Sequence, residues 1–360
     1  MTKFWSAAAV LGLLTAAPAL AWERGQVDTL TVLPNLKSGA PSSVEGLTVG
    51  PDGNIYVSSF GFNFNSPGGL SGNSDLFVIK PDGKLLRQVT IQGSSPHMLG
   101  LPFHPFTGVL LVIDFGAGKV LSVNPVNGNS TVFMTLPATP RTPGLNALTF
   151  DKSGNVYVSD SFNGVIWKTG QSGGTATSWS SGPLLSPDFD VGNPPVDLTP
   201  PFGANGIEFN NAGTIMFVAN TAAHQIIQIP VNLDGSAGTP SIFITGINAP
   251  DGIAIDSRDN LWVCANQQDE IDVLDKTGKV IAKLGDFQGI DETGTPEGFL
   301  FPASLAFSRD GRTLYVSNLA LNLPFAGAHA AIDSAWTLEA RHYTVSKIRA
   351  VIPSIGENQQ

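Results

Sequence analysis

The chain has 360 residues, of which 42% are hydrophobic and 13% are charged, and its formal net charge is −10. The hydrophobic content is sufficient for a large core and excludes a disordered chain, while 40 glycines and 26 prolines break the sequence into short segments and exclude a coiled coil. The acidic balance argues against a nucleic-acid partner.

The N-terminus has the pattern of a secretory signal peptide. Lys3 precedes an apolar run over 7–17, and a small-x-small cleavage pattern follows at 19–21. We therefore expect cleavage after Ala21, a mature chain that begins at Trp22, and a periplasmic or secreted location. No later segment has the length of apolar sequence that crosses a bilayer, so we expect no membrane span.

From about residue 44 the chain repeats a strand, a tight turn and a second strand at intervals of roughly 50 residues. Apolar and polar residues alternate within the strands, and turn residues such as Pro51-Asp52-Gly53 separate them. Each copy continues into further strands, for example at 164–168 and 241–244. Such a period is typical of a four-stranded propeller blade. We therefore predict an all-β fold, a six-bladed β-propeller that occupies residues 22–360 as a single domain.

The two ends of the repeated region each hold a strand without a local partner. Residues 27–32 come before the first copy, and residues 343–348 come after the last one. Pairing these two strands would complete the last blade and remove an exposed sheet edge. We expect the N-terminal strand to close the last blade in this way.

Three longer segments interrupt the regular pattern, at about 60–74, 170–203 and 320–341. Loops of this kind tend to lie over one face of a propeller, so we regard them as candidate lids. Residues 329–341 are the one segment that could form a short helix. Cys264 is the only cysteine, so an intrachain disulfide is excluded.

The position that we take as equivalent in the six copies carries a polar residue each time, namely Glu45, His97, Asn146, Asn205, Asp251 and Ser304. The innermost strands of a propeller line its central channel, so these side chains should converge on one axis. Two carboxylates and two carboxamides are hard oxygen ligands that suit Ca²⁺, with Mg²⁺ or another divalent ion as the alternative. The competing interpretation is a wet channel whose polar residues bind only water.

Three phrases of the sequence resemble the superfamily of SMP-30, gluconolactonase and luciferin-regenerating enzyme. They are Val44-Glu45-Gly46, Ala204-Asn205-Gly206-Ile207 and Ala249-Pro250-Asp251-Gly252-Ile253, in this order and at blade intervals. The resemblance spans nearly the whole mature chain, and related six-bladed propellers include the paraoxonases and the strictosidine synthase-like proteins. It implies a Ca²⁺-dependent lactonase or esterase in which the metal ligands are Glu45, Asn205 and Asp251, with Asn146 as a further metal or substrate contact.

Pro96-His97 resembles the pair that supplies an active-site histidine in paraoxonases. The second histidine of that family is absent, because Phe115 and Gly116 stand in its place. A pair of catalytic histidines is therefore not expected, and His97 is either a general base or a hydrogen-bonded channel residue.

These observations predict an exported Ca²⁺-dependent hydrolase of small-molecule lactones or related esters. The metal would be held by Glu45, Asn146, Asn205 and Asp251. It would polarise the carbonyl or activate a water, with Asp251 or His97 as general base. Asn146, His97 and Ser304 are the expected substrate contacts. The alternatives are a non-catalytic propeller that binds a ligand or a protein partner around a structural ion, and a condensing enzyme like strictosidine synthase.

Overall fold

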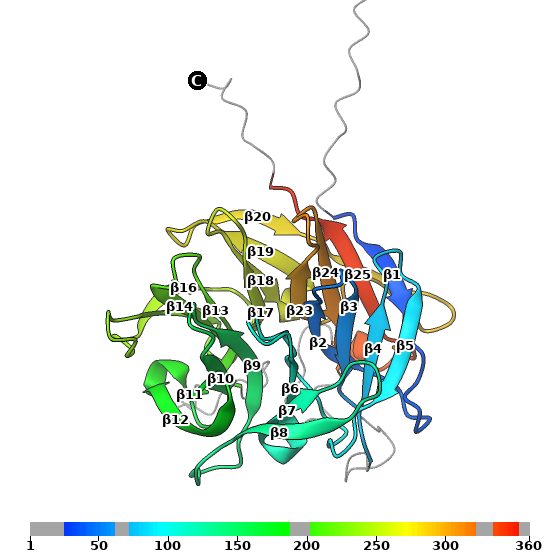
Figure 1. The fold of residues 1–360 in the computed structure, drawn as a ribbon. Coiled ribbons are helices and arrows are strands. Elements are labelled where there is room, and N and C mark those ends of the chain that lie inside the picture. The colour runs from blue at the N-terminus through cyan, green and yellow to red at the C-terminus, as the bar shows by residue number, and fades with distance from the viewer. Residues whose placement is uncertain (1–24, 62–71, 188–201, 322–333, 353–360) are drawn as a thin grey trace, which may run out of the picture.

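The computed structural model describes residues 25–61, 72–187, 202–321 and 334–352 (Figure 1). The expected signal peptide lies outside the described residues, as do large parts of the three candidate lids. The described chain consists of strands, three short 3-10 turns and one short helix. The predicted all-β fold is confirmed.

The strands form four-stranded antiparallel units that follow one another along the chain. The first unit contains β2 (Val44–Val49), β3 (Ile55–Ser59), β4 (Asp75–Ile79) and β5 (Leu85–Thr90). A further unit contains β13 (Ala204–Phe209), β14 (Ile215–Asn220), β15 (Gln225–Pro230) and β16 (Ser241–Thr245). The next contains β17 (Pro250–Ile255), β18 (Leu261–Ala265), β19 (Glu270–Leu274) and β20 (Val280–Leu284). Figure 1 shows these sheets side by side around a common centre.

Between the first of these units and the β13 unit lies a seven-stranded sheet. Its strands are β6 (Leu110–Asp114), β7 (Lys119–Val123), β8 (Ser130–Thr135), β9 (Leu145–Phe150), β10 (Val156–Asp160), β11 (Val165–Gly170) and β12 (Gly173–Ser181). A short parallel pairing of β8 with β12 joins two antiparallel groups into one sheet. The expected insertion at 170–203 therefore begins with an ordinary outer strand, β12, and a 3-10 turn at Pro183–Leu185.

The two ends of the chain meet in one sheet. Its order is β1 (Asp28–Val32), β25 (Thr344–Arg349), β24 (Thr313–Asn318) and β23 (Pro302–Phe307). β1 pairs antiparallel with β25, and Asp28 lies opposite Lys347. The sheet that contains the last repeat is therefore shared between the first and the last described strands of the chain.

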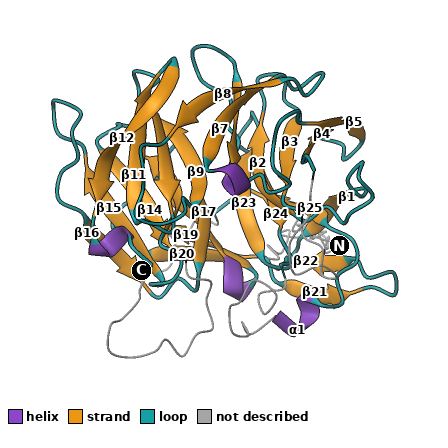
Figure 2. Ribbon diagram, turned by 90° about the horizontal axis from the view of Figure 1, so that it is seen from below, coloured by secondary structure: helices purple, strands orange, loops and turns teal. Residues whose placement is uncertain are grey.

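Two features lie outside the repeats. The hairpin of β21 (Phe287–Ile290) and β22 (Pro296–Gly298) was not expected from the sequence. Helix α1 (Ser334–Thr337) lies within the segment for which a helix was expected, and Figure 2 shows it next to this hairpin. Trp336 of the helix packs on Phe287, with ring centroids 5.8 Å apart. No helix among the described residues has the length and apolar character that a membrane span requires.

The core lies between neighbouring sheets. The second strand of most units, such as β3, β6, β10 and β18, is buried at every residue, whereas outer strands such as β5 and β16 are partly exposed. A strand buried on both faces is rich in β-branched and aromatic residues, which is the composition seen here.

Aspartates at the turns fix the hairpins, as the sequence indicated. Asp151 accepts hydrogen bonds from the backbone and side chain of Asn155 and from the hydroxyl of Tyr157. Asp256 does the same with Asn260 and with the indole of the next strand. These carboxylates are turn residues whose acceptors are occupied, so they hold the register of each hairpin.

Candidate functional site

A cavity of about 50 Å³ lies where the beginnings of the inner strands meet. Its polar lining consists of Glu45, Asn146, Asn205, Thr221, Asp251 and Asn266. Its apolar lining consists of Phe60, Leu99, Phe115, Phe202, Phe301, Leu319 and Leu321. The structure thus brings together the four residues that were expected to hold a metal ion. Each of these four is no more than 6% exposed.

The local register of the inner strands aims these side chains. Each of the four is the second residue of its strand, in β2, β9, β13 and β17. In β2, Val44 pairs with Ser59 but Leu47 pairs with Val57, so one extra residue is accommodated at the site. The same shift occurs at the equivalent places of β9, β13 and β17. A bulge of this kind redirects a side chain, and bulges are frequent next to active sites.

Glycines after the site residues let the inner strands approach one another. A Cβ atom on Gly46 would lie 2.1 Å from the carbonyl oxygen of Leu99, and one on Gly206 would lie 2.2 Å from that of Asp251. A Cβ atom on Gly252 would lie 2.5 Å from the carbonyl oxygen of Ala303. Only glycine fits such a close backbone approach, which draws the neighbouring site residues together.

Two of the six residues taken as equivalent do not reach this cavity. In β23, Pro302 pairs with Asn318, so Ala303 occupies the second position of the strand and Ser304 the third. Ser304 instead lines a separate cavity of about 350 Å³, together with Gly206 and Gly252. The sequence alignment of the last repeat was wrong by one residue, because the turn between β23 and β24 is one residue longer than the turn between β2 and β3.

The second repeat is shifted in the other direction. Met98 bridges to Asp114, and the backbone N–H of Leu99 donates to the carbonyl of Ile113, so Leu99 occupies the site position and lines the cavity. His97 stands two residues earlier and does not line it. The expectation of a polar side chain at all six equivalent positions is therefore wrong at the second and the sixth, which are Leu99 and Ala303.

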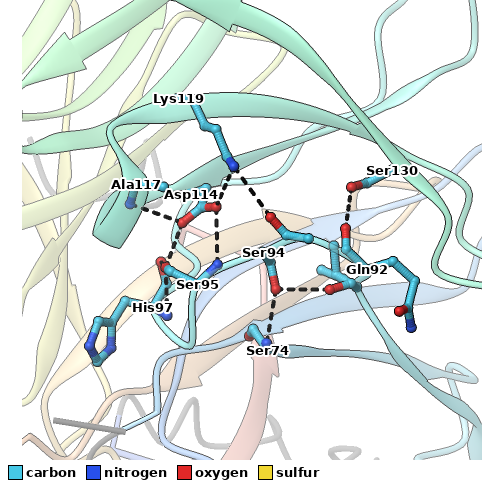
Figure 3. Close-up of polar contacts among 11 residues, drawn as sticks. Ser74, Gln92, Ser94, Ser95, His97, Asp114, Ala117, Lys119 and Ser130 are labelled. Atoms are coloured by element: carbon cyan, nitrogen blue, oxygen red, sulfur yellow. Dashed lines mark hydrogen bonds and ion pairs between the residues drawn. The ribbon is translucent and has the colours of Figure 1, made fainter. Parts of the chain in front are cut away.

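The half-buried ring of His97 packs against Phe60, with centroids 4.9 Å apart, and Phe60 is the residue that lines the cavity. The backbone N–H of His97 donates to the hydroxyl of Ser95, and this hydroxyl donates to Asp114 (Figure 3). Burial lowers the pKa of the imidazole, and a hydrogen bond at Gly61 and the charge of Asp114 oppose this shift only in part. The ring of His97 thus lies behind Phe60 and does not line the cavity.

The two carboxyl groups of the cavity titrate unusually. Burial raises the pKa of Asp251 to about 7, against the opposing hydrogen bonds from Asn266 and Asn205. Burial, and then repulsion from Asp251, raise the pKa of Glu45 well above its ordinary value. Two carboxyls that share a dry site repel each other, and a nearby positive charge relieves this cost.

Two residues that sequence reasoning missed hold the site in place. Asn266 donates from Nδ2 to Oδ2 of Asp251 at 2.8 Å, and Asn205 donates from Nδ2 to Oγ1 of Thr221 at 2.9 Å. Thr221 in turn donates to the carbonyl of Pro250 at 2.8 Å. Thr221 and Asn266 directly follow β14 and β18. Their common signal in the sequence is a polar residue immediately after the buried second strand.

The donor set fits a divalent cation that prefers oxygen. Oε2 of Glu45 is buried and has no hydrogen-bond partner among the described atoms. The Nδ2 atom of Asn205 is engaged with Thr221, which leaves its Oδ1 as a possible ligand. No group of three or more His, Cys, Asp or Glu side chains lies together among the described residues, so the site depends on two carboxylates supplemented by carboxamides. Such ligands suit Ca²⁺.

The sequence comparisons confirm the predicted resemblance. Residues 115–285 match the family described as SMP-30/Gluconolactonase/LRE-like region. The lactonase drp35 of Staphylococcus haemolyticus is 28% identical over 145 residues, which are 39% of this chain and 41% of that protein. The lactonase drp35 of a bovine strain of Staphylococcus aureus is 25% identical over 236 residues, 62% of this chain and 68% of that protein. For the first of these relatives, the match thus covers less than half of its length.

Solved structures show the likeness of fold. The luciferin-regenerating enzyme aligns with a TM-score of 0.59 and 14% identity, over 88% of this chain and 94% of that one. A calcium-binding regucalcin from Agrobacterium tumefaciens aligns with a TM-score of 0.57 and 16% identity, over 89% of this chain and 94% of that one. A gluconolactonase from Xanthomonas campestris aligns with a TM-score of 0.57 and 13% identity, over 83% of this chain and 96% of that one.

Proposed function

For a chain that resembles the SMP-30, gluconolactonase and luciferin-regenerating enzyme superfamily, we propose an exported Ca²⁺-dependent hydrolase of lactones or related esters. The observation that carries the proposal is the convergence of Glu45, Asn146, Asn205 and Asp251 on one buried cavity. The lactonases among the relatives support the reaction class. Export rests on the sequence pattern of residues 1–21 and gives a periplasmic or secreted location.

The proposal includes a six-bladed propeller closed by the N-terminal strand. Five inner strands, β2, β9, β13, β17 and β23, pack beside one another, and the segment around Leu99 completes the cycle between β2 and β9. Gly100 donates to the carbonyl of Asn146, and Ser58 donates to the carbonyl of Leu99. The pairing of β1 with β25 supports closure of the last blade.

Glu45, Asn146, Asn205 and Asp251 are the residues that would hold the cation, which is Ca²⁺ or, as alternatives, Mg²⁺ or another divalent ion. When bound, such an ion polarises the substrate carbonyl and stabilises negative charge on its oxygen. The ion also stabilises the charged form of both buried carboxyls, which makes cation binding favourable at neutral pH.

Asp251 is the group best placed to move a proton. Hydrogen bonds from Asn266, at Oδ2, and from Asn205 orient its carboxylate. Asp251 would take a proton from a water molecule in the cavity while the water oxygen bonds to the carbonyl carbon. The bond between that carbon and the ring oxygen then breaks, and Asp251 returns the proton to the leaving alkoxide. A carboxylate beside the substrate carbonyl is suited to both transfers.

A comparison of two variants tests this assignment against a base role for His97. Asp251→Asn should lower lactone hydrolysis by about 10²–10⁴-fold. His97→Gln should remain within about threefold of wild type, because Phe60 stands between His97 and the cavity. Cation content is measured for each variant, so that loss of the base is separated from loss of the ion. A large loss in His97→Gln with the cation retained would transfer the base role to His97.

A panel of lactones and aryl esters tests the function itself. Wild-type protein should hydrolyse at least one of these substrates, lose activity with a chelator and regain it with added Ca²⁺. Protein that binds Ca²⁺ tightly but hydrolyses nothing on the panel would refute the enzyme and favour a binding module with a structural ion.

A further inference from the structure

A belt of phenyl rings lies along one side of the cavity, where Phe60, Phe115 and Phe202 line it. Phe60 follows β3 and Phe115 follows β6, whereas in the next repeat Ser161 holds this position and the ring belongs to the following residue, Phe162. Ring centroids are 5.8 Å apart for Phe60 and Phe115 and 5.7 Å apart for Phe115 and Phe162. Phe202, just before β13, stacks on Phe162 at 5.4 Å.

The next two repeats have polar residues at this point. Thr221 follows β14 and Asn266 follows β18, and both line the cavity. Leu319, after β24, returns to an apolar side chain. The described lining of the cavity is therefore asymmetric. Apolar side chains make up most of it at this level, and Thr221 and Asn266 form a shorter polar arc that is continuous with Asn205 and Asp251.

Side-chain donors of the polar arc are already engaged within the protein. Asn205 donates to Thr221, Thr221 donates to Pro250, and Asn266 donates to Asp251. The buried Oε2 of Glu45 is an acceptor. Substrate hydroxyl groups that lay against Phe60, Phe115 and Phe202 would meet no polar atom of these side chains, and an unsatisfied buried hydroxyl is costly.

We infer, on the basis of the proposed function, that the substrate is a lactone with an apolar, unhydroxylated ring or side chain. This apolar part packs against Phe60, Phe115 and Phe202, and the carbonyl points to Asn205 and Asp251. Because the cavity itself measures only about 50 Å³, the reacting carbonyl occupies the cavity and the apolar part extends between the phenyl rings. Aromatic walls favour flat or branched apolar groups by contact area and ring geometry. Polyhydroxylated sugar lactones are poor substrates of this site.

A pair of six-membered lactones tests the inference kinetically. An alkyl-substituted δ-lactone and glucono-δ-lactone have the same reacting group but differ in the polarity of the ring. Wild-type kcat/KM should favour the alkyl lactone by about 100-fold or more. Phe115→Ala should lower kcat/KM for the alkyl lactone by about tenfold and change that for the sugar lactone by less than about threefold. Phe106→Ala is the matched control, because Phe106 is 63% exposed and does not line the cavity.

A binding measurement keeps the inference testable if no lactone is hydrolysed. Calorimetric titration with the corresponding alkyl-substituted lactam and polyhydroxylated lactam reports affinity without turnover. Tighter binding of the alkyl lactam, lost in Phe115→Ala, supports the inference even where hydrolysis is absent and the proposed function fails. Equal or tighter binding of the polyhydroxylated lactam, or preferential hydrolysis of the sugar lactone, overturns the inference while leaving the hydrolase proposal intact.

Discussion

Asn266 donates a 2.8 Å hydrogen bond from Nδ2 to Oδ2 of Asp251, and this contact fixes one oxygen of the carboxyl group. Gln267 donates to Oδ1 of Asn266 at 2.7 Å, which determines the end of the carboxamide that faces Asp251. Asn266 thereby orients the carboxyl group of Asp251, which lines the cavity. In the proposed function, Asn266 is a positioning residue for a group that both binds the cation and transfers a proton.

Replacing Asn266 should therefore damage the site without unfolding the protein. Asn266→Ala removes the orienting hydrogen bond, and loss of such an outer contact costs about 10–100-fold in metal affinity or activity. Calcium titration and lactone kinetics measure the two effects. Asn127→Ala, in an exposed turn, is the control. A purely structural residue would change the melting temperature and leave the calcium affinity of the folded protein unaltered.

The buried carboxyls predict how stability depends on pH. The pKa of Asp251 is about 7 in the folded protein and 3.8 ordinarily, and that of Glu45 is also raised. At pH values between 3.8 and about 7 the folded state binds more protons than the unfolded state. The stability that these carboxyls contribute through protonation is therefore fully present below about pH 4 and is lost as pH rises to about 7. Chelator-treated protein should melt at a higher temperature at pH 5 than at pH 7.5.

Added Ca²⁺ should have the opposite dependence, because it binds the charged carboxylates. The rise in melting temperature with Ca²⁺ should be larger at pH 7.5 than at pH 5. In Asp251→Asn, pH should have a weaker effect both on the melting temperature of the chelator-treated protein and on the rise in melting temperature with Ca²⁺. An equal effect of Ca²⁺ at both pH values would show that the ion binds elsewhere.

The close approach of β13 and β17 predicts that a side chain at position 206 destabilises the protein. A Cβ at position 206 would lie 2.2 Å from the carbonyl oxygen of Asp251, so Gly206→Ala must push the two inner strands apart. We expect a loss of about 1–3 kcal/mol in the free energy of unfolding and weaker calcium binding. Gly170→Ala is the control, since a Cβ there meets nothing within 4 Å. Denaturant unfolding of both variants measures the difference.

The shared sheet of β1 and β25 predicts that the N-terminal strand is required for stability. Deleting residues 27–32 exposes the edge of β25, and exposed edges invite pairing with other chains. The truncated protein should aggregate or lose a cooperative melting transition. Size-exclusion chromatography and thermal melts compare it with the protein that retains these residues. A stable monomer would contradict the closing role of this strand.

The repeat was readable because its strands and turns recur in the same order. The strands expected at 164–168 and 241–244 correspond to β11 and β16 within one or two residues. The hairpin at β21 and β22 was missed, because it falls outside the repeat and has weak alternation.

The site was predictable where short motifs surround the residue, as at Glu45, Asn205 and Asp251. It was misassigned at His97 and Ser304, because polarity alone placed the repeats in register, whereas the strand pairings place Leu99 and Ala303 at the equivalent positions. Contacts such as that of Asn266 with Asp251 join two strands of one sheet, and only the register of the folded chain shows which residues meet.

The most direct test of the central claim is the calcium dependence of lactone hydrolysis in chelator-treated wild type and Glu45→Gln, with Glu292→Gln as an exposed control. Glu45→Gln keeps the size of the side chain but removes a buried negative charge from the cavity. Wild type and Glu292→Gln should be inactive without calcium and saturate at the same calcium concentration. Glu45→Gln should require at least about tenfold more calcium for half-maximal rate. Full activity of the chelated wild type, or an unchanged calcium requirement in Glu45→Gln, would contradict a catalytic cation at this cavity.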